Sequence, residues 1–190
     1  VAALGAIAKS DSLSDGPWFA TAGFNRGGIK QLGGSNGPSV IGTTEHLKKK
    51  DRDDLYKVNV NPIARFPAIN EIVIFGQKTM QQTPSALDRV NVRRLMIYLK
   101  KKIGDIANTI LFQNNVRATW LNFTSRAENI LTDVQTRFGI TEYKLVLDET
   151  TTTADLIDRN ILYAKVYIKP ARAIEFVAID FIITKTGIEF

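Results

Sequence analysis

The stretch NVRRLMIYLKKKI, residues 91–103, combines hydrophobic side chains at helical spacing with five cationic side chains. Its hydrophobic positions recur in steps of three and four residues, and the series continues beyond the stretch: Val92, Met96, Leu99, Ile103, Ile106 and Ile110. This spacing predicts a long amphipathic helix with one narrow apolar seam. The seam has to be buried against another element.

A second series of the same kind follows at Val116, Trp120, Phe123, Ala127, Ile130, Val134 and Phe138. Gly139 is well placed to end this second helix. The connection at 113–115 is short, so the two helices are expected to run antiparallel. The side chains expected in their shared core are Leu99, Ile103, Trp120 and Phe123.

The remainder of the C-terminal half is typical of strands. Residues 141–147 and 161–170 alternate apolar and polar side chains, and 173–184 form a longer run rich in Ile, Val and Phe. The N-terminal half is more mixed. Its pattern predicts a helix over 2–10, short strand and turn over 18–29, a polar helix from Thr43 or Thr44 to Tyr56, and two short strands at 61–67 and 71–79.

The sequence therefore predicts an α+β fold. Two long antiparallel helices pack on a small, mostly antiparallel sheet, and an irregular α/β segment precedes them. The division falls at residue 84: 1–84 forms the mixed part, and 85–190 forms the helical hairpin with its sheet. Because the first residue is Val1 and not Met, we expect the chain to be the C-terminal part of something longer.

Composition excludes several classes of site. The chain of 190 residues has no cysteine, which excludes disulfides, thiol nucleophiles and thiolate metal sites. No apolar run is long enough to span a bilayer. The single histidine, His46, lies among lysines, and the acidic run at 51–54 lacks the other features of a calcium loop. No phosphate-binding glycine motif is present. We therefore predict no catalytic residue, no cofactor and no metal, and a chain that is not an enzyme.

The cations of the first long helix form two rows. Arg89, Arg93 and Lys100 lie on one flank, and Arg94 and Lys101 lie on the side away from the seam. Such an arrangement favours a docking face, although a solubilising face remains open. Nucleic acid would require interleaved aromatic side chains or a known module, and a membrane-surface helix would expose its apolar side. An acidic protein surface is the remaining partner.

Six blocks of the sequence, in this order, resemble the C-terminal part of contractile tail sheath proteins, above all those of large contractile-tailed bacteriophages. The blocks are GPWFATAGFNRGGI (16–29), RDDLYKVNVNPIARFP (52–67), IVIFGQKT (72–79), NVRRLMIYLKKKI (91–103), RATWLNFTSRAENIL (117–131) and IKPARAIEFVAIDFIIT (168–184). Together they cover nearly the whole chain, which makes the resemblance far more specific than any single motif.

The resemblance implies a structural subunit that polymerises as stacked hexameric rings around a tail tube. On triggering, such a sheath contracts and drives the tube through the host envelope without spending nucleotide. The implied partners are further copies of the chain, the tail tube protein, and baseplate and tail terminator proteins, with no nucleic acid and no membrane. The implied location is the virion, after assembly in the host cytoplasm. A phage-like bacteriocin or secretion machine and, as a lesser alternative, a nucleic-acid-binding module stay open.

Two surfaces follow as expectations. The tube-facing basic surface consists of Arg89, Arg93, Arg94, Lys100 and Lys101. The inter-subunit strand, which would pair with neighbouring subunits beside residues 143–147, consists of Ile174, Phe176, Val177, Ile179, Phe181, Ile182 and Ile183. Few charges interrupt this apolar run, and a long free edge of that kind is an aggregation hazard unless another chain covers it.

Overall fold

The structure is a computed structural model, and it describes residues 2–13, 16–29 and 40–179. Along the chain its elements are α1 (Ala2–Leu13), α2 (Gly23–Arg26), α3 (Lys49–Lys57), β1 (Ile63–Phe66), β2 (Glu71–Ile74), α4 (Val90–Ile110), α5 (Arg117–Thr136), β3 (Ile140–Val146), α6 (Ala154–Asp158) and β4 (Lys165–Pro170). The predicted α+β class is confirmed.

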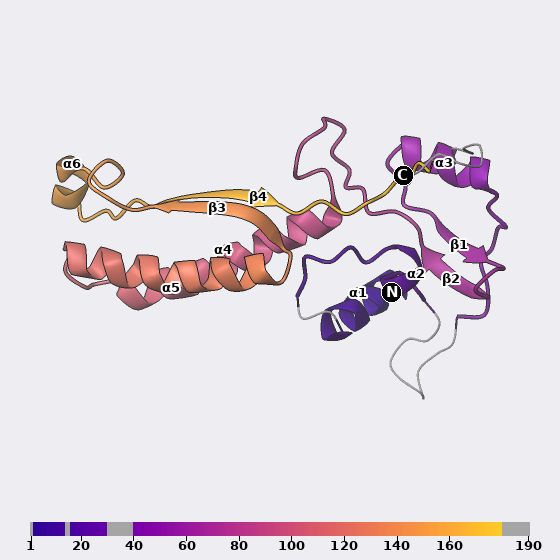
Figure 1. The fold of residues 1–190 in the computed structure, drawn as a ribbon, viewed down its shortest axis with the longest axis horizontal. Helices are drawn as coiled ribbons and strands as arrows, with labels where there is room; N and C mark the ends of the chain where they lie inside the picture. Colours follow the sequence, from indigo (N-terminus) through magenta and orange to yellow (C-terminus); the bar gives the residue numbers. More distant parts are fainter. Residues whose placement is uncertain (1, 14–15, 30–39, 180–190) are drawn as a thin grey trace, which may run out of the picture.

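The molecule is elongated (Figure 1). One end carries α1, α2, α3 and the β1–β2 hairpin, and the other carries α5, β3, β4 and α6. Helix α4 begins near the middle and runs outward beside α5, so the two long helices form the predicted antiparallel hairpin. The β3–β4 ribbon lies along α5, and α6 closes the far end.

Two clusters of buried side chains hold the hairpin together. The inner cluster contains Trp18, Leu95, Leu99, Leu131, Val134 and Ile140. The outer cluster contains Ile106, Phe123 and Ala127. Ile103 packs against both, and Trp120 is buried with its indole N–H donated to Asn115 (2.7 Å). The expected single core is therefore divided, because Leu99 and Phe123 fall in different clusters.

The predicted seams are wrong at the ends of α5. Val116 is half exposed because it is the N-cap residue, and Phe138 is 78% exposed because it follows the C-cap in a left-handed conformation (φ 60°). Within the helices, Leu95 and Leu131 are the most completely buried leucines together with Leu99, although the seams did not include them. The buried face of each helix is thus wider than the single line of residues that steps of three and four predict.

Trp18 joins the two ends of the molecule. Its ring packs into the inner cluster at 5.5 Å from Tyr98, and its indole N–H donates to the Arg137 carbonyl oxygen (2.9 Å). A Cβ at Gly139 would lie 2.6 Å from Val134 and 3.0 Å from the Trp18 ring, so this glycine is needed for the close approach. The mixed part and the helical hairpin therefore share one core at the base of α4.

Three parts of the mixed region differ in detail from the prediction. Residues 18–29 contain a turn and the short helix α2, and their strand character is reduced to one bridge from Gly28 to Val73. Helix α3 begins at Lys49 and not near Thr44, because the Thr43 hydroxyl donates to the Glu45 carbonyl oxygen (2.9 Å) in a preceding turn. The α1 helix extends three residues beyond the expected end.

Both sheets are antiparallel pairs within the described residues. The predicted strands β1 and β2 pair from Ile63 with Ile74 to Phe66 with Glu71. Strands β3 and β4 pair with an irregularity between Ile140 and Glu142, and alternate β4 residues face the helical core. Each sheet has two strands in this part of the chain, so the expected single sheet beneath the helices is a narrow ribbon.

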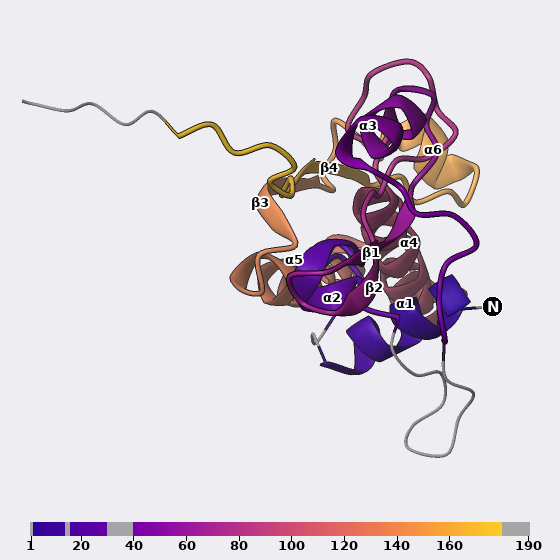
Figure 2. The same cartoon turned by 90° about the vertical axis from the view of Figure 1, so that its right-hand side faces the viewer.

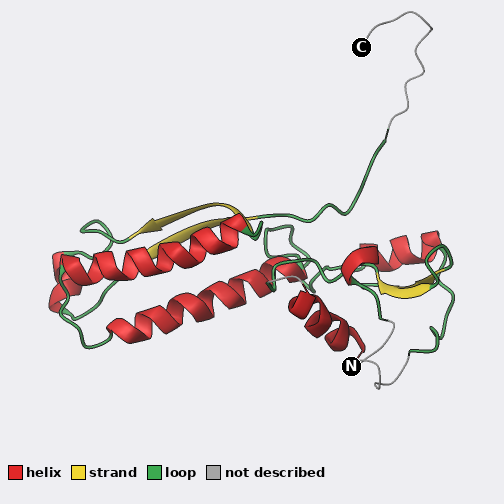
Figure 3. Ribbon diagram, turned by 60° about the horizontal axis from the view of Figure 1, so that its bottom comes forward, coloured by secondary structure: helices red, strands yellow, loops and turns green. Residues whose placement is uncertain are grey.

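After β4 the chain leaves the body. Residues 171–179, called here the C-terminal segment, are extended but pair with no strand of the described chain. Figures 2 and 3 show the segment projecting away from the ribbon and the helices. The predicted strand over 173–184 is therefore an unpaired extended segment as far as residue 179.

Candidate functional site

The basic surface expected on α4 divides into two groups. The arginines bind other parts of the chain: Arg93 donates to the Leu87 carbonyl oxygen and to Gln81 (both 2.9 Å), and Arg94 forms an ion pair with Asp11. Arg89, the N-cap residue of α4, forms ion pairs with Asp88 (3.1 Å) and Glu175 (2.6 Å). The charges of Arg89 and Arg94 are thus paired within the molecule, whereas Arg93 is exposed and donates to uncharged groups.

Lys100 and Lys101 are exposed on the next turns of α4. Between the rows Ile97 is 67% exposed, as expected for a small apolar spot on an outward face. The two lysines therefore lie about two to three helical turns from the arginines and offer accessible charge to a partner, as the exposed Arg93 also does. The structure of a single chain does not test contact with a tube, and the assignment of this surface remains a prediction.

The apolar side chains of the C-terminal segment are highly exposed. Ile174, Phe176, Val177 and Ile179 keep between 66% and 85% of their surface in contact with solvent. Phe181, Ile182 and Ile183, the other residues expected in the inter-subunit strand, lie outside the described residues. Four large hydrophobic side chains in nine residues of extended chain form an unusual surface for a soluble protein. The pairing of this segment with a neighbour stays a prediction.

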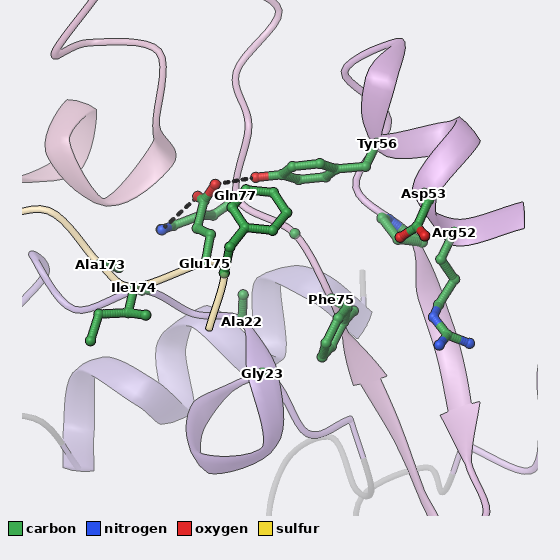
Figure 4. A pocket seen from close by; sticks show the side chains of 14 residues that line it. Ala22, Gly23, Arg52, Asp53, Tyr56, Phe75, Gln77, Ala173, Ile174 and Glu175 are labelled. Atoms are coloured by element: carbon green, nitrogen blue, oxygen red, sulfur yellow. Dashed lines mark hydrogen bonds between the residues drawn. The ribbon is translucent and has the colours of Figure 1, made fainter. Parts of the chain in front are cut away.

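One residue of the segment is held tightly. The Glu175 carboxylate accepts hydrogen bonds from Arg89 Nε (2.6 Å) and Arg89 Nη2 (2.9 Å), from the Tyr56 hydroxyl (2.6 Å) and from Gln77 Nε2 (3.3 Å). Figure 4 shows the Tyr56 and Gln77 side chains directed at the carboxylate. We call these four residues the Glu175 cluster. Its members come from α3, from the chain after β2, from the start of α4 and from the C-terminal segment.

The pKa shifts agree with a charged carboxylate. Burial alone would raise the pKa of Glu175, but the hydrogen bonds from Arg89 and Tyr56 outweigh it and the pKa is lowered. Burial, with the hydrogen bond and charge of Glu175, raises the pKa of Tyr56 well above its ordinary value. The hydrogen bond to Glu175 also raises the pKa of Arg89. At neutral pH the cluster therefore contains a carboxylate, a guanidinium and a neutral phenol.

A cavity of about 180 Å³ lies beside the cluster. Its walls come from the C-terminal segment and from the mixed part, and include Ile174, Phe176, Ala22, Arg52 and Phe75. The Arg52 guanidinium lies over the Phe66 ring at 4.7 Å, and Phe66 lies 4.9 Å from Phe75. The cavity is therefore lined by one of these rings, Phe75, and by Arg52, and both contact Phe66.

The sequence did not identify the Glu175 cluster. Arg89 was expected on a docking surface, and Glu175 is one of the few charges within the apolar run over residues 173–184. The one available signal was this isolation of a carboxylate between Ile174 and Phe176. Its partners Tyr56 and Gln77 carry no motif, and they lie about 100 residues away along the chain.

The described residues contain no group of three or more His, Asp or Glu side chains that could hold a metal ion. None of the helices in the described ranges is long and apolar enough to cross a membrane.

Comparison with known proteins gives consistent results. The tail sheath protein of Vibrio phage KVP40 is 40% identical over 98% of this chain, and that of Enterobacteria phage T4 is 36% identical over 98%. The chain spans about a quarter of the length of these relatives (26% and 27%).

Solved structures share the fold. One of them is the sheath complex of an extracellular contractile injection system (PVC) in the contracted state. The alignment covers 94% of this chain and 49% of the solved chain, with a TM-score of 0.78 and 22% sequence identity. The anti-feeding prophage baseplate aligns with 95% of this chain and 49% of its own, also with a TM-score of 0.78, at 19% identity. The family model described as phage tail sheath C-terminal domain matches residues 82–184, which include α4, α5, β3, α6 and β4. The chain therefore belongs to the phage tail sheath C-terminal domain family.

Proposed function

We propose that this chain is the C-terminal part of a contractile tail sheath subunit, which polymerises around a tail tube and contracts to drive the tube through a host envelope. The observation that carries the proposal is the family match over residues 82–184, the part that contains the helical hairpin, the β3–β4 ribbon and the exposed C-terminal segment. The high identity to sheath proteins of phages KVP40 and T4 over the whole chain supports it.

The C-terminal segment is the proposed linkage between subunits, as stacked hexameric rings require. It exposes four large apolar side chains and has no strand partner in the described chain. The β3–β4 ribbon offers the complementary feature, because each strand of a two-stranded sheet keeps one edge of backbone N–H and C=O groups. A segment donated by a neighbouring copy would add a strand beside residues 143–147, as in β-strand addition.

The tube-facing surface is proposed on the outward side of α4. Lys100 and Lys101 supply accessible charge, whereas Arg89, Arg93 and Arg94 contribute less because they bind within the chain. A single exposed charge pair contributes only about 0–1 kcal/mol. Repeated over many subunits, such contacts would hold a sheath in register and still release during contraction. Baseplate and tail terminator proteins would contact the two ends of the polymer.

A second candidate is the sheath of an extracellular injection system, because the solved structures with this fold belong to such machines. The phage assignment is favoured by identity, since the phage relatives reach 40% and the injection-system structures 22%. A nucleic-acid module using α4 is the least supported, because three of the five expected cations bind inside the chain.

The test is polymerisation of the chain, observed by negative-stain electron microscopy with and without duplex DNA. We expect tubular polymers in the absence of DNA. Deleting residues 173–190 should abolish them, and deleting residues 184–190 should weaken them if the donated strand extends past residue 184. Normal polymers from the longer deletion would exclude linkage by this segment, and salt-dependent DNA binding without any polymer would favour the nucleic-acid reading.

A further inference from the structure

We propose that Glu175 is the anchor of the C-terminal segment. Its carboxylate fixes the point at which the chain leaves the molecule, and divides the segment into a held inner part, residues 171–175, and a free outer part from residue 176. Glu175 is thus a positioning residue: it does not contact a partner, but it sets the direction and the free length of the chain that would do so.

Within the described residues, hydrogen bonds attach the segment to the rest of the chain at two points, and Ile174 and Phe176 in addition line the cavity beside the mixed part. The first is the end of β4, where the Ala171 amide donates to the Gly139 carbonyl oxygen (3.1 Å). The second is Glu175, whose side chain is 17% exposed between neighbours that are 85% and 81% exposed. Residues 172–174 and 176–179 are all exposed. Without the carboxylate contacts, the segment after residue 171 would keep only the cavity-side packing of residues that remain highly exposed, such as Ile174 and Phe176.

The geometry of the contact suits an anchor. Arg89 donates through two nitrogens to the two carboxylate oxygens, which fixes the plane of the carboxylate as well as its position. Tyr56 adds a third donor from α3. The buried Gln77 amide turns its nitrogen toward Glu175, although its own Oε1 then finds no partner in the described residues. Three separate elements thus converge on one side chain.

The consequence for assembly rests on the proposed function, in that the outer part must reach a second copy of the chain. While the anchor holds, a pull on the outer part acts on α3, on the end of β2 and on the base of α4. Once it releases, the pull acts on the last residues of β4. Release also adds the five residues 171–175 to the free length, which extends the reach by about 17 Å at the spacing of an extended chain.

The experiment uses spin labels at two introduced cysteines, Lys50→Cys on α3 and Val177→Cys on the outer part. The chain has no cysteine of its own, so both labels are specific. Pulsed dipolar spectroscopy then gives the distribution of distances between them. We expect a narrow distribution in the parent, and one broader by at least about twofold with Glu175→Ala, because a segment freed at residue 171 behaves as a flexible chain.

The matched control is Glu128→Ala, the same change at an exposed position of α5, which should leave the distribution unchanged. Glu175→Ala is expected to fold because Arg89 keeps its ion pair with Asp88, and far-UV circular dichroism checks this. If Glu175→Ala loses its helical signal, the same distance measurement is made on Glu175→Gln and Tyr56→Phe. Both substitutions weaken the contacts of the carboxylate, and both should broaden the distance distribution. A distribution that stays narrow in the folded variants overturns the proposal, because the apolar neighbours would then hold the segment.

This readout is independent of polymerisation. If the parent forms no polymer but Glu175→Ala broadens the distance distribution, the proposed function fails and the anchor stands. If the parent polymerises and the distribution does not change in the folded variants, the anchor fails and the proposed function stands.

Discussion

At the scale of single residues, Gly139 and Gly104 show how differently two glycines can act. Gly139 lies under the Trp18 ring and against Val134, where a Cβ has no room. Gly104 lies within α4, where a Cβ would have no atom within 4 Å. The first glycine permits the contact that joins the two ends of the molecule, whereas the second only makes the unfolded chain more flexible.

Substituting each glycine by alanine should therefore have opposite effects. We expect Gly139→Ala to lower the free energy of unfolding by about 1–3 kcal/mol, because the inner cluster must shift to accept a methyl group. Gly104→Ala should raise it by about 0.5–1 kcal/mol, since alanine loses less conformational entropy in a helix. Urea denaturation measures both. Equal effects of the two substitutions would contradict the packing assigned to Gly139.

Glu175 gives a second prediction at this scale, on acid stability. Its pKa is lower in the folded chain than its ordinary value of 4.5, so its stabilising contribution is present above that value. The contribution is lost as the pH falls through the lowered folded pKa, when the carboxylate binds a proton. Arg89 stays cationic and Tyr56 neutral over this range because both pKa values are raised.

The measurement compares the free energy of unfolding of the parent with that of Glu175→Gln, from neutral pH down to the acid limit of solubility. The difference between the two should be largest near neutrality and should shrink below pH 4.5. A difference that is constant over the whole range would mean that the charge of Glu175 contributes nothing.

At the scale of elements, periodicity predicted most of the fold. Both long helices, the β1–β2 and β3–β4 strands and the short connection between the helices are present as expected. Helix ends were less predictable, because they depend on single caps: α3 starts where Asp51 accepts the Lys48 amide (2.8 Å), and not at the threonines upstream. The Glu175 cluster was not predictable, because Arg89 and Glu175 are separated by 86 residues and meet only in the folded chain.

Adjacent positions of α5 test the helical hairpin. Trp120 is 7% exposed and Leu121 is 61% exposed, since successive side chains point about 100° apart around the helix axis. Trp120→Ala should lower the free energy of unfolding by about 3–5 kcal/mol through the cavity it leaves. Leu121→Ala should change it by no more than about 0.5 kcal/mol. Thermal or urea denaturation of both variants checks the pair, and similar losses in the two would contradict the orientation of α5.

At the scale of the whole molecule, the ion pairs of the arginines and the exposure of the lysines have separate roles. Arg94 with Asp11 and Arg89 with Glu175 connect α4 to the first helix and to the C-terminal segment. Reversing these arginines would disturb the fold as well as any surface. Lys100 and Lys101 can be reversed with less disturbance because both are exposed.

Lys100→Glu with Lys101→Glu should reduce the fraction of tubes that become sheathed, and should leave the far-UV spectrum and the unfolding midpoint unchanged. Raising the salt concentration should weaken sheathing by the parent in the same direction, because exposed charges are screened. The matched control is Lys49→Glu with Lys50→Glu on α3, which makes the same change in charge at exposed positions outside the proposed surface. Equal sheathing by both variants would mean that the α4 lysines serve only solubility.

The shared core at Trp18 also means that α4 extends outward from a fixed attachment near its start. Because an α-helix rises about 1.5 Å per residue, the part of α4 beyond Leu99 forms an arm about 17 Å long. The arm is attached to the mixed part at the inner cluster, where Trp18 packs against Leu95 and Leu99 and lies close to Gly139. A small rotation of the mixed part would therefore displace the far end of α4, where Leu111 and Phe112 are exposed, by more than it displaces the inner cluster.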